Sequence, residues 1–246
     1  MQQPNEHNAH ESRGLILAIA SVICFSATSL LLSYLNSAHA VDGWVASAYR
    51  GLIGLAFIHC FQSKTGKLSL SHIVTNPLLF MRGLIGGSTI PMYYICIMEI
   101  GPGRAGLITG SYPIFAAIIA ALWIHESLNR GYFVYIAFAM LGLLAVFSSS
   151  DFSGGIFFYD LIAVLGAVAA GFCVVMIRHL RHTETTSNIF AAQCVFTILI
   201  TVVVAGDRLF ISDPTALALT LLAAVIVVGG QVCITECFRH LSVAKG

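Results

Sequence analysis

Eight long apolar segments dominate this sequence and restrict it to folds that keep most side chains away from water. They run over residues 15–35, 44–61, 83–98, 106–124, 132–147, 161–177, 189–205 and 216–238. Most approach the ~20 residues that a helix needs to cross ~30 Å of hydrocarbon. Hydrophobic residues make up 58% of the chain and charged residues 9%, whereas soluble domains carry about 25% charge. We therefore predict an all-α membrane protein, a polytopic helical bundle of eight spans.

The cations alternate between the two sides that such spans would create. The odd-numbered links hold Arg104 and Arg208, and Arg50 lies within a span. The remaining cations all fall in the amino-terminal tail or in even-numbered links: Arg13, Lys64, Lys67, Arg82, Arg130, Arg178, Arg181, Arg239 and Lys245. Links rich in Lys and Arg stay in the cytoplasm. We therefore expect a multi-pass protein of the plasma (bacterial inner) membrane with a cytoplasmic amino terminus.

Two stretches of the chain share one pattern at a constant offset of 140 positions. Residues 92–106 and 232–246 each show an apolar helix end, an acidic residue, a basic residue and a small-residue turn. One unit then holds five spans. Because five is odd, the second unit enters the membrane in the opposite direction, a plan that recurs in secondary transporters. We predict an inverted five-plus-five arrangement with repeats at 14–149 and 157–246.

The same register predicts that the second repeat is incomplete. It contains three spans and the start of a fourth, so the chain holds eight spans and the beginning of a ninth. Residues 243–246 are typical of a helix start. We interpret the chain as C-terminally truncated, and an eight-span remnant is the alternative.

Five short motifs follow one another along the first repeat. They are Arg82-Gly83-Leu84-Ile85-Gly86, Tyr93-Tyr94, Gly103-Arg104-Ala105-Gly106, Ser111-Tyr112-Pro113-Ile114-Phe115 and His125-Glu126-Ser127-Leu128. In this order they resemble the EamA-like family of the drug/metabolite transporter superfamily, with His125 where the family carries glycine. The resemblance implies a ten-span secondary carrier of a small metabolite. We expect it to work by alternating access, without an ATPase of its own.

Two charged residues are candidates for the transport cavity. Arg50 lies ~9 Å below Trp44 at 1.5 Å per residue, and a central Arg costs about 2.5–3.5 kcal/mol on insertion scales. Its guanidinium either has a partner or cavity inside the bundle, or reaches back to the outer headgroups. Glu236 is either a proton-accepting or cation-recognising carboxylate, or an interfacial partner of Arg239 at i, i+3.

The other candidates are uncharged. Tyr93 and Tyr94 lie mid-segment, where a buried hydroxyl needs a partner, but adjacent residues point ~100° apart on a helix, so at most one faces any single site. Pro91 and Pro113 are expected to kink their helices, which suits either a moving carrier or a static bundle. Polar residues on other spans complete the set of cavity candidates: Ser29, Ser111, Tyr112 and Gln231.

Enzyme, metal and nucleic-acid signatures are lacking in the sequence. We predict no catalytic residue, no metal site and no cofactor. The expected partners are a small-molecule solute with a coupling proton or ion, membrane lipid and a second copy of the chain in a homodimer. The rival interpretation is a polytopic membrane enzyme or a non-transporting scaffold, and an enzyme would need several reactive side chains converging in one leaflet.

Overall fold

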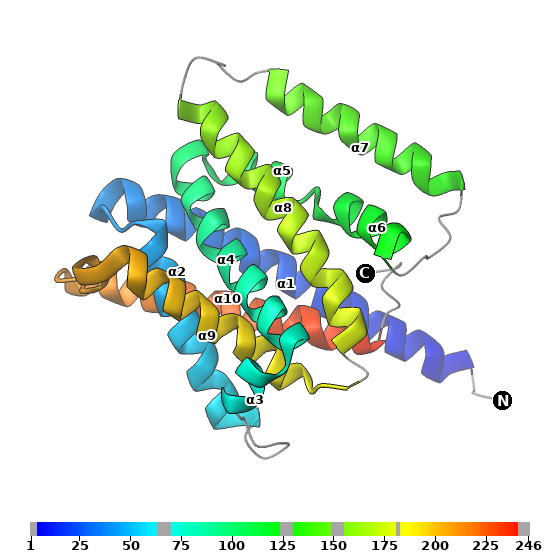
Figure 1. The fold of residues 1–246 in the computed structure, drawn as a ribbon, viewed down its shortest axis with the longest axis horizontal. Coiled ribbons are helices and arrows are strands. Elements are labelled where there is room, and N and C mark those ends of the chain that lie inside the picture. The colour runs from blue at the N-terminus through cyan, green and yellow to red at the C-terminus, as the bar shows by residue number, and fades with distance from the viewer. Residues whose placement is uncertain (1–3, 63–69, 124–129, 149–154, 181–182, 241–246) are drawn as a thin grey trace.

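The computed structural model describes residues 4–62, 70–123, 130–148, 155–180 and 183–240, and within these ranges it contains helices and no strand (Figure 1). The helices are α1 (Pro4–His39), α2 (Gly43–Phe57) continued by the π-turn η1 (Ile58–Gln62), α3 (Leu70–Thr75), α4 (Pro77–Ile100), α5 (Pro102–Thr109), α6 (Tyr112–Trp123), α7 (Arg130–Ser148), α8 (Gly155–Leu180), α9 (Thr186–Ala205), the 3₁₀ turn η2 (Gly206–Leu209) and α10 (Pro214–His240).

Short polar residues begin several of these helices. The Asp42 side chain accepts a hydrogen bond from the backbone N–H of Val45 at 2.9 Å and so caps α2. Asn76 caps α4 in the same way. Such caps satisfy N–H groups that the first helical turn leaves without partners. Between α4 and α5, Gly101 has a φ of 81°, which only glycine adopts at low cost. The chain can therefore turn sharply from one helix into the next.

Six helical stretches are long and apolar enough to cross a membrane: Ser12–His39, Pro77–Ile100, Pro102–Trp123, Gly155–Leu180, Thr186–Leu209 and Pro214–Ile234. Each coincides with one of the predicted apolar segments. The other two segments are helical as well, in α2 with 15 residues and α7 with 19. The third segment was expected to begin at Gly83, but Asn76 caps the helix earlier and α4 begins at Pro77. The expectation that Arg82 belongs to the preceding link is therefore wrong.

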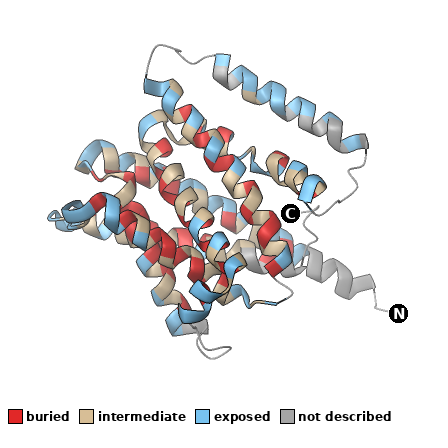
Figure 2. Ribbon diagram, viewed as in Figure 1, coloured by how far each residue is buried: buried red, intermediate tan, exposed pale blue. Residues whose placement is uncertain are grey.

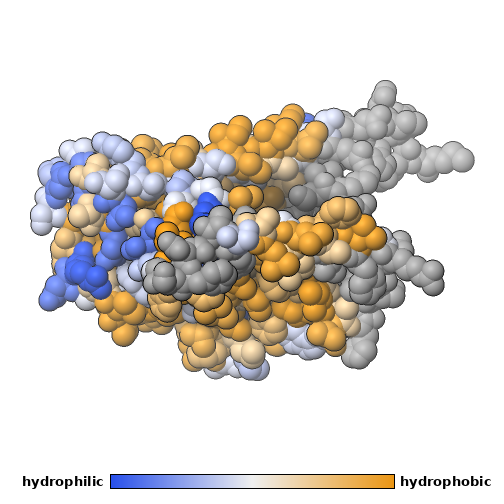
Figure 3. Space-filling model, turned by 90° about the horizontal axis from the view of Figure 1, so that it is seen from above, coloured by the Kyte–Doolittle hydropathy of each residue, from blue (hydrophilic) through white to orange (hydrophobic). Residues whose placement is uncertain are grey.

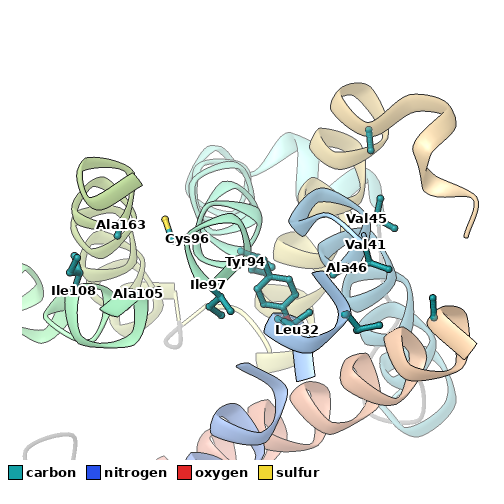
Figure 4. Close-up of a cluster of buried hydrophobic side chains, with 14 residues drawn as sticks. Leu32, Val41, Val45, Ala46, Tyr94, Cys96, Ile97, Ala105, Ile108 and Ala163 are labelled. Atoms are coloured by element: carbon teal, nitrogen blue, oxygen red, sulfur yellow. The ribbon is translucent and has the colours of Figure 1, made fainter. Parts of the chain in front are cut away.

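The helices pack in long pairs around α4. Helix α1 lies along α10, α4 packs against both α8 and α9, and α2 contacts α9 and α10. The buried residues concentrate in this central part, as Figure 2 shows. One apolar cluster contains Leu32, Tyr94 and Ile97, which approach one another between α1 and α4 (Figure 4). A second cluster forms around Ile58 and Leu180.

The outer surface is largely apolar. Helix α7 lies at the margin of the bundle in Figure 1, and its Phe138 and Leu141 side chains are exposed. Figure 3 shows hydrophobic residues over much of one face and hydrophilic residues gathered at one end. Exposed apolar patches of this kind mark surfaces that contact something other than water. This surface suits the acyl chains of a bilayer.

At one end of the bundle, a hydrogen bond and an ion pair tie the link between α1 and α2 to the link between α9 and α10. His39 Nδ1 lies 2.7 Å from Asp213 Oδ2, and Arg208 donates to Asp42 at 3.0 Å. Both links were predicted on the non-cytoplasmic side. The pKa of Asp213 is lowered, chiefly by the hydrogen bond from the backbone N–H of Thr215.

A third contact ties two links that were both predicted in the cytoplasm. The Glu184 carboxylate accepts hydrogen bonds from His72 at 2.6 Å, Asn76 at 3.0 Å and Asn188 at 3.2 Å. Burial opposes ionisation of this carboxyl group, but the three hydrogen bonds outweigh it and lower the Glu184 pKa. Each of these polar ties therefore joins links that the alternating charges assign to one side.

Candidate solute pathway

Four of the predicted cavity residues form a connected polar chain inside the bundle. Ser29 donates to the Phe25 carbonyl at 2.9 Å, so its oxygen is left to accept from the Tyr93 hydroxyl at 3.3 Å. The Tyr93 and Tyr94 ring centroids are 6.3 Å apart. The Arg50 guanidinium carbon lies 5.7 Å from the Tyr94 ring centroid, within the range of a cation–π interaction. This polar chain of four residues therefore joins α1, α4 and α2.

The close approach of two backbones explains why Arg50 meets Tyr94. A Cβ added at Gly43 would lie 2.7 Å from the backbone nitrogen of Ile95, so only glycine lets the start of α2 approach the end of α4 this closely. Arg50 follows Gly43 by two helical turns on the same face. Side chains lean toward the amino terminus of their own helix, and these two helices run in opposite directions. The Arg50 and Tyr94 side chains consequently lean toward each other.

The Arg50 guanidinium thus has an aromatic partner inside the bundle, and the residue is half-buried. The Tyr94 side chain is 2% exposed, and the Arg50 guanidinium lies within hydrogen-bonding reach of its hydroxyl without forming a well-aligned bond. A guanidinium can only donate hydrogen bonds. The Tyr94 O–H is therefore still available as a donor to a ligand.

Ser111 and Tyr112 lie at an interruption between α5 and α6 rather than in the polar chain. The Ser111 hydroxyl donates to the Ile108 carbonyl at 2.6 Å. The helix breaks at Gly110 and Ser111, and α6 begins at Tyr112 with Pro113 in its first turn, where the missing backbone N–H costs no helical hydrogen bond. Pro91, by contrast, is accommodated inside the continuous helix α4. The two prolines therefore have different consequences for the backbone.

Gln231 and Glu236 are both on α10. Gln231 is half-buried. Its neighbour Gly230 lies against α1, because a Cβ added there would be 2.9 Å from the Cys24 Cβ. The backbone of Glu236 is helical, but its side chain lies outside the described residues. The α10 candidates thus lie on the helix that runs along α1, the helix that carries Ser29.

A buried ion pair that sequence reasoning missed lies beside this region. Arg104 donates to Asp160 through Nε and Nη2, both at 2.7 Å. The Asp160 side chain is 0% exposed and that of Arg104 is 20% exposed. Such two-pronged guanidinium–carboxylate pairs are among the strongest charge-assisted hydrogen bonds. The pair fixes the start of α5 to α8. The sequence held a signal for this pair, because Arg104 and Asp160 both lie in links that were predicted on the same side of the membrane.

The sequence of the first five spans decides the family. The model of the EamA-like transporter family matches residues 12–148, more than half of the chain. The chain belongs to the EamA-like transporter family. Together with the apolar helices, this membership makes the protein a multi-pass membrane transporter of small metabolites.

Two relatives of this EamA-like protein are transport proteins. It is 28% identical to the pseudopaline exporter CntI of Pseudomonas aeruginosa over 236 residues, which cover 93% of this chain and 79% of the exporter. The same exporter from a second strain gives identical values. The mouse solute carrier family 35 member G1 is 27% identical over 135 residues, 54% of this chain and 35% of that carrier.

Within the stretch that the EamA-like model matches, the structure reveals a buried arginine, Arg82. Arg82 is 5% exposed, and its Nη2 donates to Gln193 Oε1 at 2.9 Å. The amide nitrogen of Gln193 donates in turn to the Gly86 carbonyl at 3.2 Å. Sequence reasoning assigned Arg82 to a cytoplasmic link, because the third apolar segment was taken to begin at Gly83. In the folded EamA-like chain, α8 and α9 cover it.

Proposed function

We propose that this protein is a secondary transporter that moves a small metabolite outward across the plasma membrane by alternating access. The observation that carries the proposal is the polar chain from Ser29 through Tyr93 and Tyr94 to Arg50. Polar and ionisable groups are expensive inside a membrane, and they mark solute and ion pathways. A chain of them that connects three helices of a transporter supports a solute site at this depth.

An inverted repeat supports the alternating-access mechanism. In a two-fold arrangement, only residues near the symmetry axis contact their own counterparts. A Cβ added at Gly54 would lie 2.7 Å from the Cys194 sulfur, and these two residues are 140 positions apart, the offset between the two repeats. The axis would then pass where α2 crosses α9. The pairing of α1 with α10 is likewise matched by that of α8 with α4.

The same proposal covers the repeats and the orientation. The repeats span 14–149 and 157–246. The amino terminus faces the cytoplasm, because it lies on the same side as the links rich in Lys and Arg. The contact between His72 and Glu184 joins two of these links. The outward direction rests on the likeness to an exporter. The remaining cavity candidates, Ser111, Tyr112 and Gln231, would join the pathway as the α5–α6 break and α10 move. Coupling would use a proton or ion, with Glu236 as the candidate carboxylate.

A two-sided labelling experiment tests alternating access. The variant Ser29→Cys is reconstituted in vesicles and exposed to a membrane-impermeant thiol reagent from one face at a time. We expect modification at position 29 from both faces, because the carrier presents one central site alternately to each side. Cys60, which is exposed, is followed in the same chain as the reference for reagent quality. Modification from a single face only would refute alternating access.

A flux experiment tests the polar chain itself. Tyr93→Phe deletes the hydroxyl that donates to Ser29, and Tyr34→Phe makes the same chemical change at an exposed position. In cells loaded with a panel of labelled metabolites, we expect reduced export with Tyr93→Phe and unchanged export with Tyr34→Phe. If the wild-type chain moves no solute while its deletion alters a lipid or cell-wall product, the membrane-enzyme interpretation replaces the transporter.

A further inference from the structure

Arg82 stands out because it is a buried cation whose donors are incompletely used. Its side chain folds back over Gly86, where an added Cβ would collide with Nη1. Gln193 takes Nη2, but Nε and Nη1 are buried and have no hydrogen-bond partner. A guanidinium has five N–H donors and no acceptor. Several of those donors are therefore unsatisfied.

No ion pair joins Arg82 to a carboxylate among the side chains that the structure describes. Asp160 is bound to Arg104, Asp42 to Arg208, Asp213 to His39 and Glu184 to His72. Burying an unpaired charge costs several kcal/mol even after relaxation. Inside a membrane such groups are rare, and they mark substrate and ion pathways. For a guanidinium, the matching partner is an oxyanion, which accepts several N–H donors at once.

The surroundings of Arg82 reinforce the need for an anion. The Cys173 sulfur lies 3.4 Å from the Cβ position at Gly86, beside Nη1 of Arg82 and within its hydrogen-bonding reach, but a thiol is only a weak acceptor. Arg82 contacts Gln193 on α9, and a Cβ added at Gly51, the neighbour of Arg50, would lie 3.2 Å from the Cys194 carbonyl oxygen. The two cations therefore flank the same stretch of α9.

The two arginines also lie at different depths. Arg50 is ~10 Å from the start of α2 and Arg82 is ~8 Å from the start of α4, at 1.5 Å per residue. These two helices begin at opposite ends of the bundle, because the start of α2 packs against the end of α4. An anion that crosses the bundle would therefore meet one cation in each half.

We infer that Arg82 binds an oxyanion, a carboxylate or phosphate group, that reaches it along the transport pathway. The inference rests on the proposed transport function for the route of arrival. The oxyanion belongs either to the transported solute or to a lipid headgroup. It accepts the hydrogen bonds that Nε and Nη1 leave unused. Arg50 would attract the same group in the other half of the pathway.

The thiol of Cys173 allows a test that needs no knowledge of the natural solute. The full chain is reconstituted in phosphatidylcholine vesicles and treated with anionic sulfonatoethyl methanethiosulfonate or with cationic trimethylammonioethyl methanethiosulfonate. Modification of Cys173 is followed by mass spectrometry, and exposed Cys60 serves as the internal reference. We expect Cys173 to favour the anionic reagent about tenfold or more relative to Cys60, because a buried positive charge concentrates anions locally.

Two variants of Arg82 separate its charge from a general change in structure. Arg82→Lys should keep most of the preference, whereas Arg82→Gln should abolish it. Unaltered Cys60 modification and unaltered size-exclusion profiles show that the variants fold. A preference that survives in Arg82→Gln, or the absence of any preference in the wild-type chain, overturns the inference. No modification of Cys173 by either reagent overturns it too, because an ion then cannot reach Arg82.

Protection of the wild-type chain identifies the source of the oxyanion without any variant. Succinate should slow modification of Cys173 about twofold at half occupancy, and succinamide, its neutral diamide, should not. Protection by phosphatidylglycerol in the vesicles, with none by succinate, assigns the site to a lipid headgroup. Protection by neither overturns the inference. Adding reagent to one face at a time separates the two proposals. Modification from both faces without a charge preference retains alternating access and rejects the anion site. Modification from one face with a charge preference retains the anion site and rejects alternating access.

Discussion

Replacing Arg104 should destabilise the fold more than replacing Asp160, although the two residues form one buried ion pair. Removing one partner of a buried ion pair costs about 3–5 kcal/mol, because the other charge is left without compensation. The Asp160 side chain is 0% exposed, whereas the Arg104 side chain is 20% exposed. Arg104→Gln therefore leaves a dry carboxylate and should cost about 5 kcal/mol. Asp160→Asn leaves a cation that still reaches water, and this variant should lose about 3 kcal/mol of stability.

Thermal unfolding followed by tryptophan fluorescence in detergent measures this asymmetry. For a chain of this size, 1 kcal/mol shifts Tm by about 2–4 °C, so Arg104→Gln should lose about 10–20 °C and Asp160→Asn about 6–12 °C. The control is the Arg208–Asp42 pair, whose side chains are 60% and 33% exposed. Exposed pairs contribute about 0–1 kcal/mol, so Arg208→Gln should lose at most about 4 °C.

The double variant sharpens the experiment. Arg104→Gln combined with Asp160→Asn removes both charges and should recover part of the loss, because neither position then holds a charge that lacks its partner. The reasoning fails if Asp160→Asn costs as much as Arg104→Gln, or if the double variant loses the sum of both single losses.

Three further predictions concern packing, pH and coupling. Gly87→Ala should destabilise the bundle by about 1–3 kcal/mol, because its Cβ would lie 2.8 Å from the Thr197 backbone nitrogen. The control Gly142→Ala should not, because its Cβ would meet nothing within 4 Å. Thermal melts of the two variants check this difference. The lowered Glu184 pKa stabilises the fold above the ordinary Glu pKa, and that stabilisation is lost as the pH falls through the lowered value. The wild-type Tm should therefore drop more than that of Glu184→Gln as the pH falls from about 5 to about 3, and equal drops would contradict the assignment. Glu236→Gln should flatten the pH dependence of flux in loaded vesicles, and an unaltered profile removes this residue from coupling.

The chain's secondary structure and its membrane character could be predicted from the sequence. Stretches of this length and apolarity form helices, because a helix satisfies every backbone hydrogen bond within lipid. The ordered motifs from Arg82 to Leu128 were enough to predict the family that the comparison confirms. The assignment of links to alternating sides is also consistent with the ties His39–Asp213 and His72–Glu184. Length, charge and motif order are properties of local sequence, so they can be read without a fold.

The tertiary structure alone decided which faces meet. A segment that is apolar all round shows no periodicity that distinguishes a packed face from a lipid-facing one, and helix association in lipid depends on small residues and a few polar contacts. The sequence therefore could not show that Gly43 brings Arg50 to Tyr94, or that Arg82 lies under α8 and α9 instead of in a link. Those partners come from helices far apart in the chain. Only packing determines them.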